Sequence, residues 1–152
     1  MRSAFSAAWL QQELHRRGVQ GITVDSFGVS AVAGKKAEPD ARDAAQRFGI
    51  SLENHRAQRI NAEHIAKADL IFIMDRLNQV RLEQLAREAK PRTWLLGTLH
   101  PEQPLENGGY EISDPYSQGP EETYACFETL VCCLDSLAAR LEAGNINQAD
   151  AS

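Results

Sequence analysis

The pair Arg2-Ser3 stands at the start of a predicted amphipathic helix, and this placement suits the binding of an anion. Apolar residues follow at helical spacing until Gly18 ends the pattern. The first backbone N–H groups of a helix have no partner inside the helix, and the helix dipole is positive at that end. An arginine there adds a planar fork of donors that fits phosphate oxygens.

Two acidic residues stand where an α/β protein often has its site. The run from Asp69 to Asp75 is continuously apolar between its two acids, which predicts a buried parallel strand with Asp75 at its carboxyl end. Asp114-Pro115-Tyr116 precedes a helix predicted to begin at Pro120. Asp75 could also be the phosphoacceptor of a receiver domain, but the sequence shows neither the early acidic cluster nor the late lysine of such domains.

The three cysteines, Cys126, Cys132 and Cys133, all lie in one predicted helix. Cys126 and Cys133 share a helical face with leucines, which predicts a core position, since cysteine packs as a small apolar side chain. Their odd number and clustering argue against a secreted disulfide framework and favour a reducing cytoplasm. No spacing of histidine and cysteine indicates a metal site, and we expect no cofactor.

Strands and helices alternate along the chain, which predicts an α/β fold with a parallel sheet flanked by helices on both faces. Strands are expected over residues 21–28 and within 69–75 and 93–97. The helices are expected to begin near Arg2, Pro39, Asn61, Leu77 and Pro120, with Asn61 as an N-cap. The last helix is expected to end at Gly144, and residues 98–113 are expected to form a loop. We predict a single domain over residues 1–144 and a frayed tail over 145–152.

Two packing predictions accompany these elements. In the helix after the central strand, Leu77, Val80 and Leu85 fall at helical spacing with Ala89 and predict a buried face. In the first helix, the large apolar side chains of Phe5 and Trp9 are expected to cover the sheet.

The net charge of −5 limits the kinds of molecule that the chain is expected to bind. An acidic protein is a poor match for nucleic acid or an anionic membrane surface, so neither is expected as a partner. Hydrophobic residues make up 43 % of the chain and no apolar run approaches the length of a membrane span, as in an ordinary soluble domain. An anion site in such a protein must be local, made by a few arginines and backbone amides.

Several stretches, taken together and in order, resemble the low-molecular-weight protein tyrosine phosphatases, particularly the bacterial members encoded with exopolysaccharide export systems. The stretches are Arg2-Ser3, Asp25-Ser26-Phe27-Gly28, His55-Arg56-Ala57, Ala68 through Arg76, and Asp114-Pro115-Tyr116. The resemblance extends to about residue 142. It implies a three-layer sandwich of the flavodoxin-like kind and hydrolysis of phosphotyrosine. It also implies a phosphotyrosine protein as substrate, with a bacterial tyrosine kinase of polysaccharide export as a candidate.

The resemblance assigns roles at the site. Arg2 would clamp the phosphate, Asp114 would protonate the leaving phenolate, and Tyr116 would flank the aromatic substrate. Ser3 would cap the helix and hydrogen-bond the nucleophilic thiolate. The plainer alternatives are a solvated arginine near the end of the chain, an ordinary Asp-Pro turn and a half-buried tyrosine.

Three further residues would support the phosphate loop rather than act in the chemistry. Ser26 and His55 resemble residues that brace this loop through hydrogen bonds, and Asp75 would hold a loop in place. A histidine without a partner motif is more often structural than catalytic, which agrees with a supporting role for His55.

The chain departs from the family pattern at one point. The family reads Cys-x-x-x-x-x-Arg-Ser between its first strand and first helix, and here only Arg2-Ser3 matches. The first strand and the nucleophilic cysteine are not in the sequence, so the chain as given is expected to be inactive. One hypothesis is a phosphatase whose start is misplaced or whose chain was trimmed. The alternatives are a catalytically dead remnant that binds an anion or a partner, and a chain that folds poorly and self-associates through an open sheet.

Overall fold

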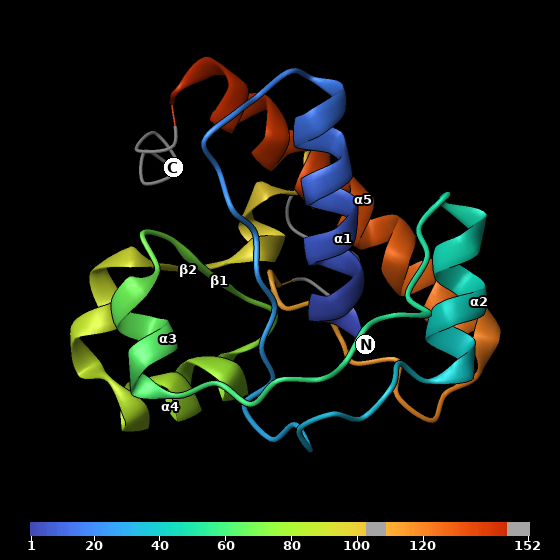
Figure 1. The fold of residues 1–152 in the computed structure, drawn as a ribbon, viewed down its shortest axis with the longest axis horizontal. Helices are drawn as coiled ribbons and strands as arrows, with labels where there is room; N and C mark the ends of the chain where they lie inside the picture. Colours follow the sequence, from blue (N-terminus) through green and yellow to red (C-terminus); the bar gives the residue numbers. More distant parts are fainter. Residues whose placement is uncertain (103–108, 146–152) are drawn as a thin grey trace.

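The computed structural model describes residues 1–102 and 109–145 as five α-helices, two 3₁₀ helices and two strands (Figure 1). The described elements are α1 Arg2–Arg16, α2 Pro39–Arg47, α3 Ala62–Lys67, β1 Ile71–Ile73, α4 Arg76–Leu85, the 3₁₀ helix η1 Arg87–Arg92, β2 Thr93–Leu95, the 3₁₀ helix η2 Leu96–Leu99 and α5 Pro120–Ala143. Apart from Asn145, the predicted tail lies outside the described residues. Part of the predicted loop before Ser113 lies outside them too.

The sheet is parallel, as expected for the predicted α/β fold. β1 and β2 pair in register, with Phe72 opposite Trp94, and α4 and η1 make the connection between them. A parallel pair needs such a long crossover because the chain must return to the same end of the sheet. The carboxyl end of β1 leads directly to Asp75, which brings this acid to the edge where α/β proteins place their sites.

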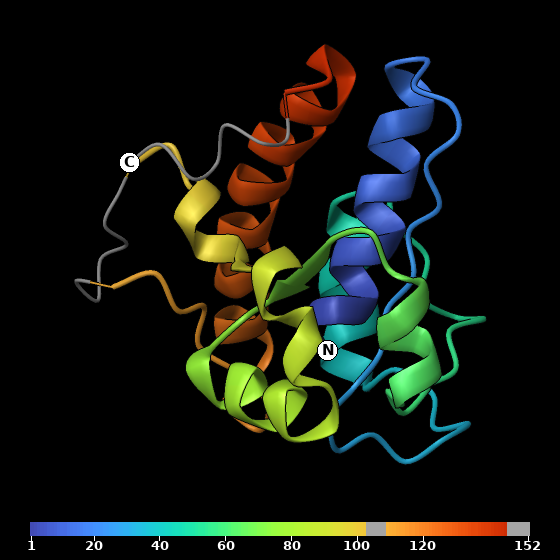
Figure 2. The ribbon, with the colours of Figure 1, turned by 90° about the vertical axis from the view of Figure 1, so that its left-hand side faces the viewer.

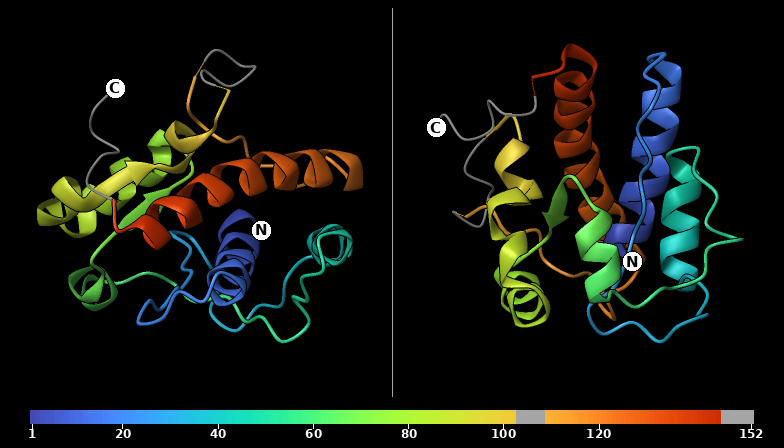
Figure 3. Two further views of the ribbon diagram at one scale, coloured as in Figure 1. Left: turned by 90° about the horizontal axis from the view of Figure 1, so that it is seen from above. Right: turned by 60° about the vertical axis from the view of Figure 1, so that its left-hand side comes forward.

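α5 is the central helix of the molecule. α1 and α2 pack on one side of it, and η2 lies on the other side, as Figures 2 and 3 show from different directions. Pro120 opens α5 at its first position, and Gly144 ends it with φ 72°, a left-handed conformation that glycine adopts without strain. Both ends of this helix are therefore as the sequence predicts.

The main core forms between helices. Phe5 of α1 is fully buried and stacks on Phe127 of α5, with 4.0 Å between the ring centroids, and it meets Phe48 edge-on. These ring contacts join α1 to α5 and to Phe48, and aromatic pairs of this geometry are favourable beyond the area that they bury. The prediction that Phe5 and Trp9 cover the sheet stays a prediction.

α4 buries a different face from the one predicted. Leu77, Val80 and Leu85 are exposed, with 57 %, 53 % and 47 % of their surface open to solvent. Leu82 is buried instead, in a second small cluster with Ala86, and Ala89 of η1 joins them. The helix ends at Leu85 rather than near Ala89. The four apolar residues therefore do not lie on one face of a single helix.

The strand predicted over residues 21–28 is not part of the sheet. In the described structure this segment runs back along α1 without a ladder, and only Gly28 forms an isolated parallel bridge, with Arg59 (Figure 1). Ile22 and Val24 still pack against the main core. The β-branched pattern correctly indicated an extended chain with one buried side. An extended chain becomes a strand only where a neighbouring backbone offers hydrogen bonds.

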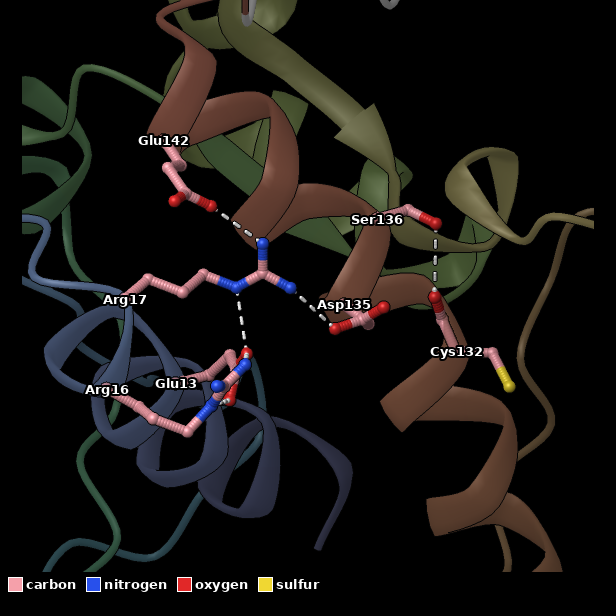
Figure 4. A network of polar contacts seen from close by, with 7 residues as sticks. All are labelled: Glu13, Arg16, Arg17, Cys132, Asp135, Ser136 and Glu142. Atoms are coloured by element: carbon pink, nitrogen blue, oxygen red, sulfur yellow. Dashed lines mark hydrogen bonds and ion pairs between the residues drawn. The ribbon is translucent and has the colours of Figure 1, made fainter.

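A charged network joins the end of α1 to the end of α5 (Figure 4). Arg17 donates to Glu13, to Asp135 and to Glu142, each at 2.8 Å, and Arg16 also donates to Glu13. Hydrogen bonds from Arg16 and then Arg17 hold the pKa of Glu13 at about 2, below its usual 4.5. The network fixes α1 against α5 at the end of the molecule that lies away from Arg2.

Candidate active site

Arg2 joins three segments of the chain. It is the first residue of α1, and its side chain is only 10 % exposed. Its Nη1 lies 2.9 Å from Oδ2 of Asp75 and also donates to the carbonyl of Ile112, while its Nη2 lies 3.6 Å from Oδ2 of Asp114. The structure thus brings three of the predicted site residues together.

Asp75 holds two elements at once. Its Oδ1 accepts a hydrogen bond from the backbone N–H of Asn78 at 2.8 Å, which caps α4, while its Oδ2 faces Arg2. Asn78 in turn accepts from the backbone N–H of Met74 at 3.2 Å. Asp75 therefore fixes the guanidinium of Arg2 relative to the end of β1, which is compatible with the supporting role that the resemblance assigns to it.

The segment that carries Asp114 is anchored at its base and open at its tip. The backbone N–H of Ile112 donates to the carbonyl of Met74 at 2.8 Å, and Pro115 is buried. The carboxylate of Asp114 accepts from the N–H of Tyr116 at 3.2 Å, yet its side chain is 54 % exposed. The carboxylate of Asp114 is consequently accessible from solvent.

Tyr116 marks the rim of the site. Its side chain is largely exposed, at 56 %. The hydrogen bond to Glu38 is the main cause of the raised pKa of Lys35, and Tyr116 adds to it, so Tyr116 lies within electrostatic reach of Lys35. The next residue, Ser117, has φ 62°, a conformation that residues with a Cβ rarely adopt. Because Lys35 belongs to the loop of residues 28–36, this loop reaches the same rim as Tyr116.

Cys126 lies near the site but is not poised as a nucleophile. Burial raises the pKa of its thiol to about 11, an effect that Asp114 reinforces and Arg2 partly offsets. Its Sγ lies 3.7 Å from the carbonyl of Ser113, as in a weak hydrogen bond. The nucleophilic form of cysteine is the thiolate, and this thiol stays protonated at neutral pH.

His55 sits beside the amino end of the chain. The pKa of His55 is lowered, mainly by burial and further by the charges of the Met1 amino group and the Arg56 guanidinium. The imidazole is therefore neutral at pH 7, and one of its ring nitrogens can accept a hydrogen bond. The predicted bracing role of His55 remains a prediction.

Ser3 does not take its predicted capping role, and the described part of the chain shows no contact that bears on the role of Ser26. Ser3 does not cap α1: the helix begins at Arg2 with Met1 as its N-cap and no side-chain cap, two residues earlier than a cap at Ser3 would place its start. Ser26 is half-buried, and its hydroxyl makes no hydrogen bond within the described residues. Its predicted bracing of a phosphate loop stays a prediction.

The contribution of Ile112 was missed. Its carbonyl accepts from Arg2 and its N–H donates to Met74. Backbone groups carry no residue-type signal, so no sequence pattern could have shown this. Asn78 could have been noticed, since a polar residue three positions after an N-cap aspartate is a pattern of helix starts.

The described residues contain no group of three or more His, Cys, Asp and Glu side chains placed to hold a metal ion. None of the helices in residues 1–102 and 109–145 is long and apolar enough to cross a membrane. What the site offers instead is one positioned guanidinium at the amino end of a helix and one accessible carboxyl group beside it. This pair can bind an oxyanion and give a proton to a group that leaves it.

The comparisons with known proteins agree over nearly the whole chain. A family model described as "Low molecular weight phosphotyrosine protein phosphatase" matches residues 1–147. The low molecular weight protein-tyrosine-phosphatase Ptp of Acinetobacter johnsonii is 30 % identical over 125 residues, which cover 80 % of this chain and 82 % of that protein.

Solved structures show the same relationship. The structure of Wzb from Vibrio vulnificus in complex with benzylphosphonate is similar with a TM-score of 0.77 and 27 % identity, over 91 % of this chain and 90 % of that one. The YwlE arginine phosphatase from Geobacillus stearothermophilus is similar with a TM-score of 0.79 and 26 % identity, over 96 % and 88 %. The α/β sandwich expected from the sequence is confirmed by these likenesses.

Proposed function

The chain belongs to the family of low molecular weight phosphotyrosine protein phosphatases, and from this premise we propose that Arg2 and Asp114 bind and process aryl phosphate monoesters. The observation that supports the assignment most directly is the convergence of Arg2, Asp75 and Asp114 at the amino end of α1. Family membership accounts for the class of reaction, and the geometry suggests which residues would take part.

Arg2 has the right constraints for phosphate. Nη1 is committed to Asp75 and to the carbonyl of Ile112, so the orientation of the planar group is fixed. Nη2 faces Asp114 at 3.6 Å, which is longer than a hydrogen bond. A phosphate dianion can replace this loose contact, and it would also meet the free N–H groups in the first turn of α1.

Asp114 supplies the proton for the leaving group. When a nucleophile bonds to phosphorus and the bond between phosphorus and the phenolic oxygen breaks, the electron pair stays on that oxygen, and the acid form of Asp114 donates its proton there. The exposed ring of Tyr116, two residues later, can flank an aromatic leaving group. Asp114 is then an aspartate, and it takes up a new proton from solvent, to which its side chain is open.

The nucleophile is not among the described side chains of this site. Cysteine is the nucleophile that the resemblance implies, and Cys126 stays a protonated thiol because burial raises its pKa to about 11. We therefore propose that a polypeptide of residues 1–152 alone binds the substrate anion without turning it over. Binding of an anion or a partner without catalysis is the alternative function for the same face.

Phosphoarginine is a second candidate substrate. The observation that favours it is the likeness to the arginine phosphatase of Geobacillus stearothermophilus, which spans 96 % of this chain. A phosphoarginine would leave as a guanidine, so Asp114 would give its proton to nitrogen instead of oxygen. The benzylphosphonate bound to Vibrio vulnificus Wzb is an aromatic phosphate mimic and favours phosphotyrosine.

The experiment compares two polypeptides. One is residues 1–152, and the other carries a family first strand and a Cys-x-x-x-x-x loop joined to Arg2. Phosphate release is measured from matched phosphotyrosine, phosphoarginine and phosphoserine peptides. We expect the extended polypeptide to hydrolyse phosphotyrosine fastest. Residues 1–152 should give neither turnover nor a phosphocysteine by mass spectrometry.

The outcomes that contradict the proposal are specific. A phosphocysteine at Cys126, Cys132 or Cys133 would show that the chain carries its own nucleophile. Faster release from phosphoarginine would change the substrate assignment. An Arg2→Lys variant of the extended polypeptide that keeps full activity would show that Arg2 does not clamp the phosphate, because lysine keeps the charge but loses the planar fork.

We also propose a cellular location and a substrate protein for this chain. We place the protein in the cytoplasm, which the free state of its cysteines supports. We take a phosphotyrosine protein as the substrate, and a bacterial tyrosine kinase of polysaccharide export as the first one to test. Release of phosphate from such a kinase, compared with release from an unrelated phosphotyrosine protein, measures this preference.

A further inference from the structure

A patch of positive charge lies beside the site, on two segments that contain no acidic residue. Residues 26–37 carry Lys35 and Lys36, residues 54–62 carry Arg56 and Arg59, and neither segment contains aspartate or glutamate. All four side chains are on exposed residues. In a chain with a net charge of −5, this local excess stands out as a feature of one surface.

The two segments are held together by their backbones. The N–H of Gly34 donates to the carbonyl of Ala57 and the N–H of Ala57 donates to the carbonyl of Lys35, both at 2.8 Å. The N–H of Gly28 donates to Gln58 at 2.9 Å, and Gly28 also accepts from Ile60 at 3.1 Å. The four cations therefore belong to one built surface and not to two independent loops.

Within this surface, Lys36 and Arg56 are directly opposite each other in an antiparallel bridge. Side chains at such positions point to the same face, and like charges there destabilise the pairing. Arg56 donates to the carbonyls of Glu53 and His55, which holds its guanidinium without neutralising it. Lys35 has an acid partner, Glu38, at 2.6 Å, whereas Lys36 and Arg59 have none within the described residues.

The patch adjoins the proposed active site. His55 is the neighbour of Arg56, and it lies close enough to the amino group of Met1 to feel its charge. Lys35 is within electrostatic reach of Tyr116. In Figures 1 and 2 the amino end of α1 and the loop of residues 28–36 lie at the same, lower end of the molecule.

Resting on the function proposed above, we propose that Lys36, Arg56 and Arg59 bind acidic residues that flank the phosphorylated residue of a protein substrate. An acidic segment would relieve the repulsion between Lys36 and Arg56, which the free protein leaves uncompensated. The substrate class is then a phosphotyrosine inside an acidic stretch of chain, and not a small aryl phosphate.

The test uses four peptides of one length that combine two changes. The central tyrosine is phosphorylated or not, and the flanking positions carry glutamate or glutamine. Binding to residues 1–152 is measured by fluorescence anisotropy at low and at physiological salt. We expect glutamate flanks to tighten binding roughly three- to thirtyfold at low salt, as a few surface ion pairs do, and salt to reduce this gain.

Two charge-reversal variants make the test specific. Lys36→Glu should abolish the gain from glutamate flanks, and it should also raise Tm by about 1 to 4 °C because Arg56 acquires an opposite charge. Lys90→Glu changes the net charge equally, at an exposed lysine of η1 without an ion pair in the described structure. Lys90→Glu should leave most of the gain intact.

The design separates the two proposals. If glutamate and glutamine flanks bind equally, or if Lys36→Glu and Lys90→Glu act alike, the acidic-substrate inference is wrong and the proposed function stands. If phosphorylation does not change binding while glutamate flanks still tighten it through Lys36, the proposed phosphate site is wrong and the inference about the positive patch stands.

Discussion

Arg2 and Asp75 form an ion pair, with 2.9 Å between Nη1 and Oδ2, that links the amino ends of two helices. Arg2 opens α1, and Asp75 is the N-cap of α4. Negative charge is favourable at the positive end of a helix dipole, so the carboxylate of Asp75 stabilises α4 directly. The same carboxylate sets the position of the guanidinium that would hold the substrate.

Replacing Asp75 separates its two roles. Asp75→Asn keeps a side chain that caps α4 about as well, but it removes the charge that faces Arg2. The pair is partly shielded, so we expect the free energy of unfolding to fall by about 1–3 kcal/mol. Asp75→Ala also removes the cap and should lose about 1 kcal/mol more. Urea denaturation of the three proteins measures both steps, and equal losses in Asn and Ala would show that the cap contributes nothing.

Replacing Asp114 should slow the reaction according to the leaving group. In the extended polypeptide, Asp114→Asn should reduce the rate on phenyl phosphate by roughly 10² to 10⁴, the usual contribution of a general acid. The loss should shrink for leaving groups of low pKa, because their phenolates depart without a proton. The measurement is kcat over a series of substituted aryl phosphates. A loss of the same size across the series would mean that Asp114 only shapes its loop.

Glu13 makes stability depend on pH in the acid range. Its pKa is about 2 in the folded protein, held there by Arg16 and then Arg17, and near 4.5 when unfolded. Between these values the unfolded chain binds more protons, so lowering the pH favours unfolding. The contribution of Glu13 is complete above about pH 4.5 to 5 and is lost as the pH falls to about 2.

The variant Glu13→Gln tests this dependence. It should be less stable than the parent protein at pH 7, and the two should converge in stability as the pH approaches 2. Urea denaturation at a series of pH values gives the two curves. A constant difference between them at every pH would show that Glu13 acts through packing instead of through its charge.

The sheet edges should promote self-association of residues 1–152. β1 and β2 form a two-stranded sheet, so β1 has no second strand beside it within the described residues, and residues 21–28 run extended beside α1 without a ladder. Open edges pair readily with other chains. We expect dimers or larger species in sedimentation velocity, reduced by Thr23→Pro, which removes a backbone donor from the extended segment. A monodisperse monomer with a sharp thermal transition would contradict this prediction.

Local features of the fold were predictable because local chemistry sets them. Asn61 caps α3 as expected, with its side chain accepting from the N–H of His64 at 2.9 Å. Gly144 and Pro120 bound α5 for the same reason: the backbone preferences of these residue types act within one turn. The Glu13–Arg17 contact was readable too, since residues four apart face each other on a helix.

Features that join distant segments were not predictable from the residues. Phe5 and Phe127 each have an apolar pattern, but nothing in either pattern says that the two rings meet. The exposed Leu77 and Val80 looked like a core face because periodicity shows that a helix has an apolar side and not which side is covered. The resemblance supplied the roles of Arg2, Asp75 and Asp114, while their contacts came only with the structure.

The contact between Arg2 and Ile112 spans 110 residues of sequence, and this separation sets an order of events during synthesis. At a typical rate of about 5–20 residues per second, the ribosome needs roughly 5 to 20 s after Arg2 to produce Ile112. Phe127, the partner of Phe5, emerges later still. α1 is therefore made well before the partners on α5 that bury it, and its apolar face is within reach of chaperones during that interval.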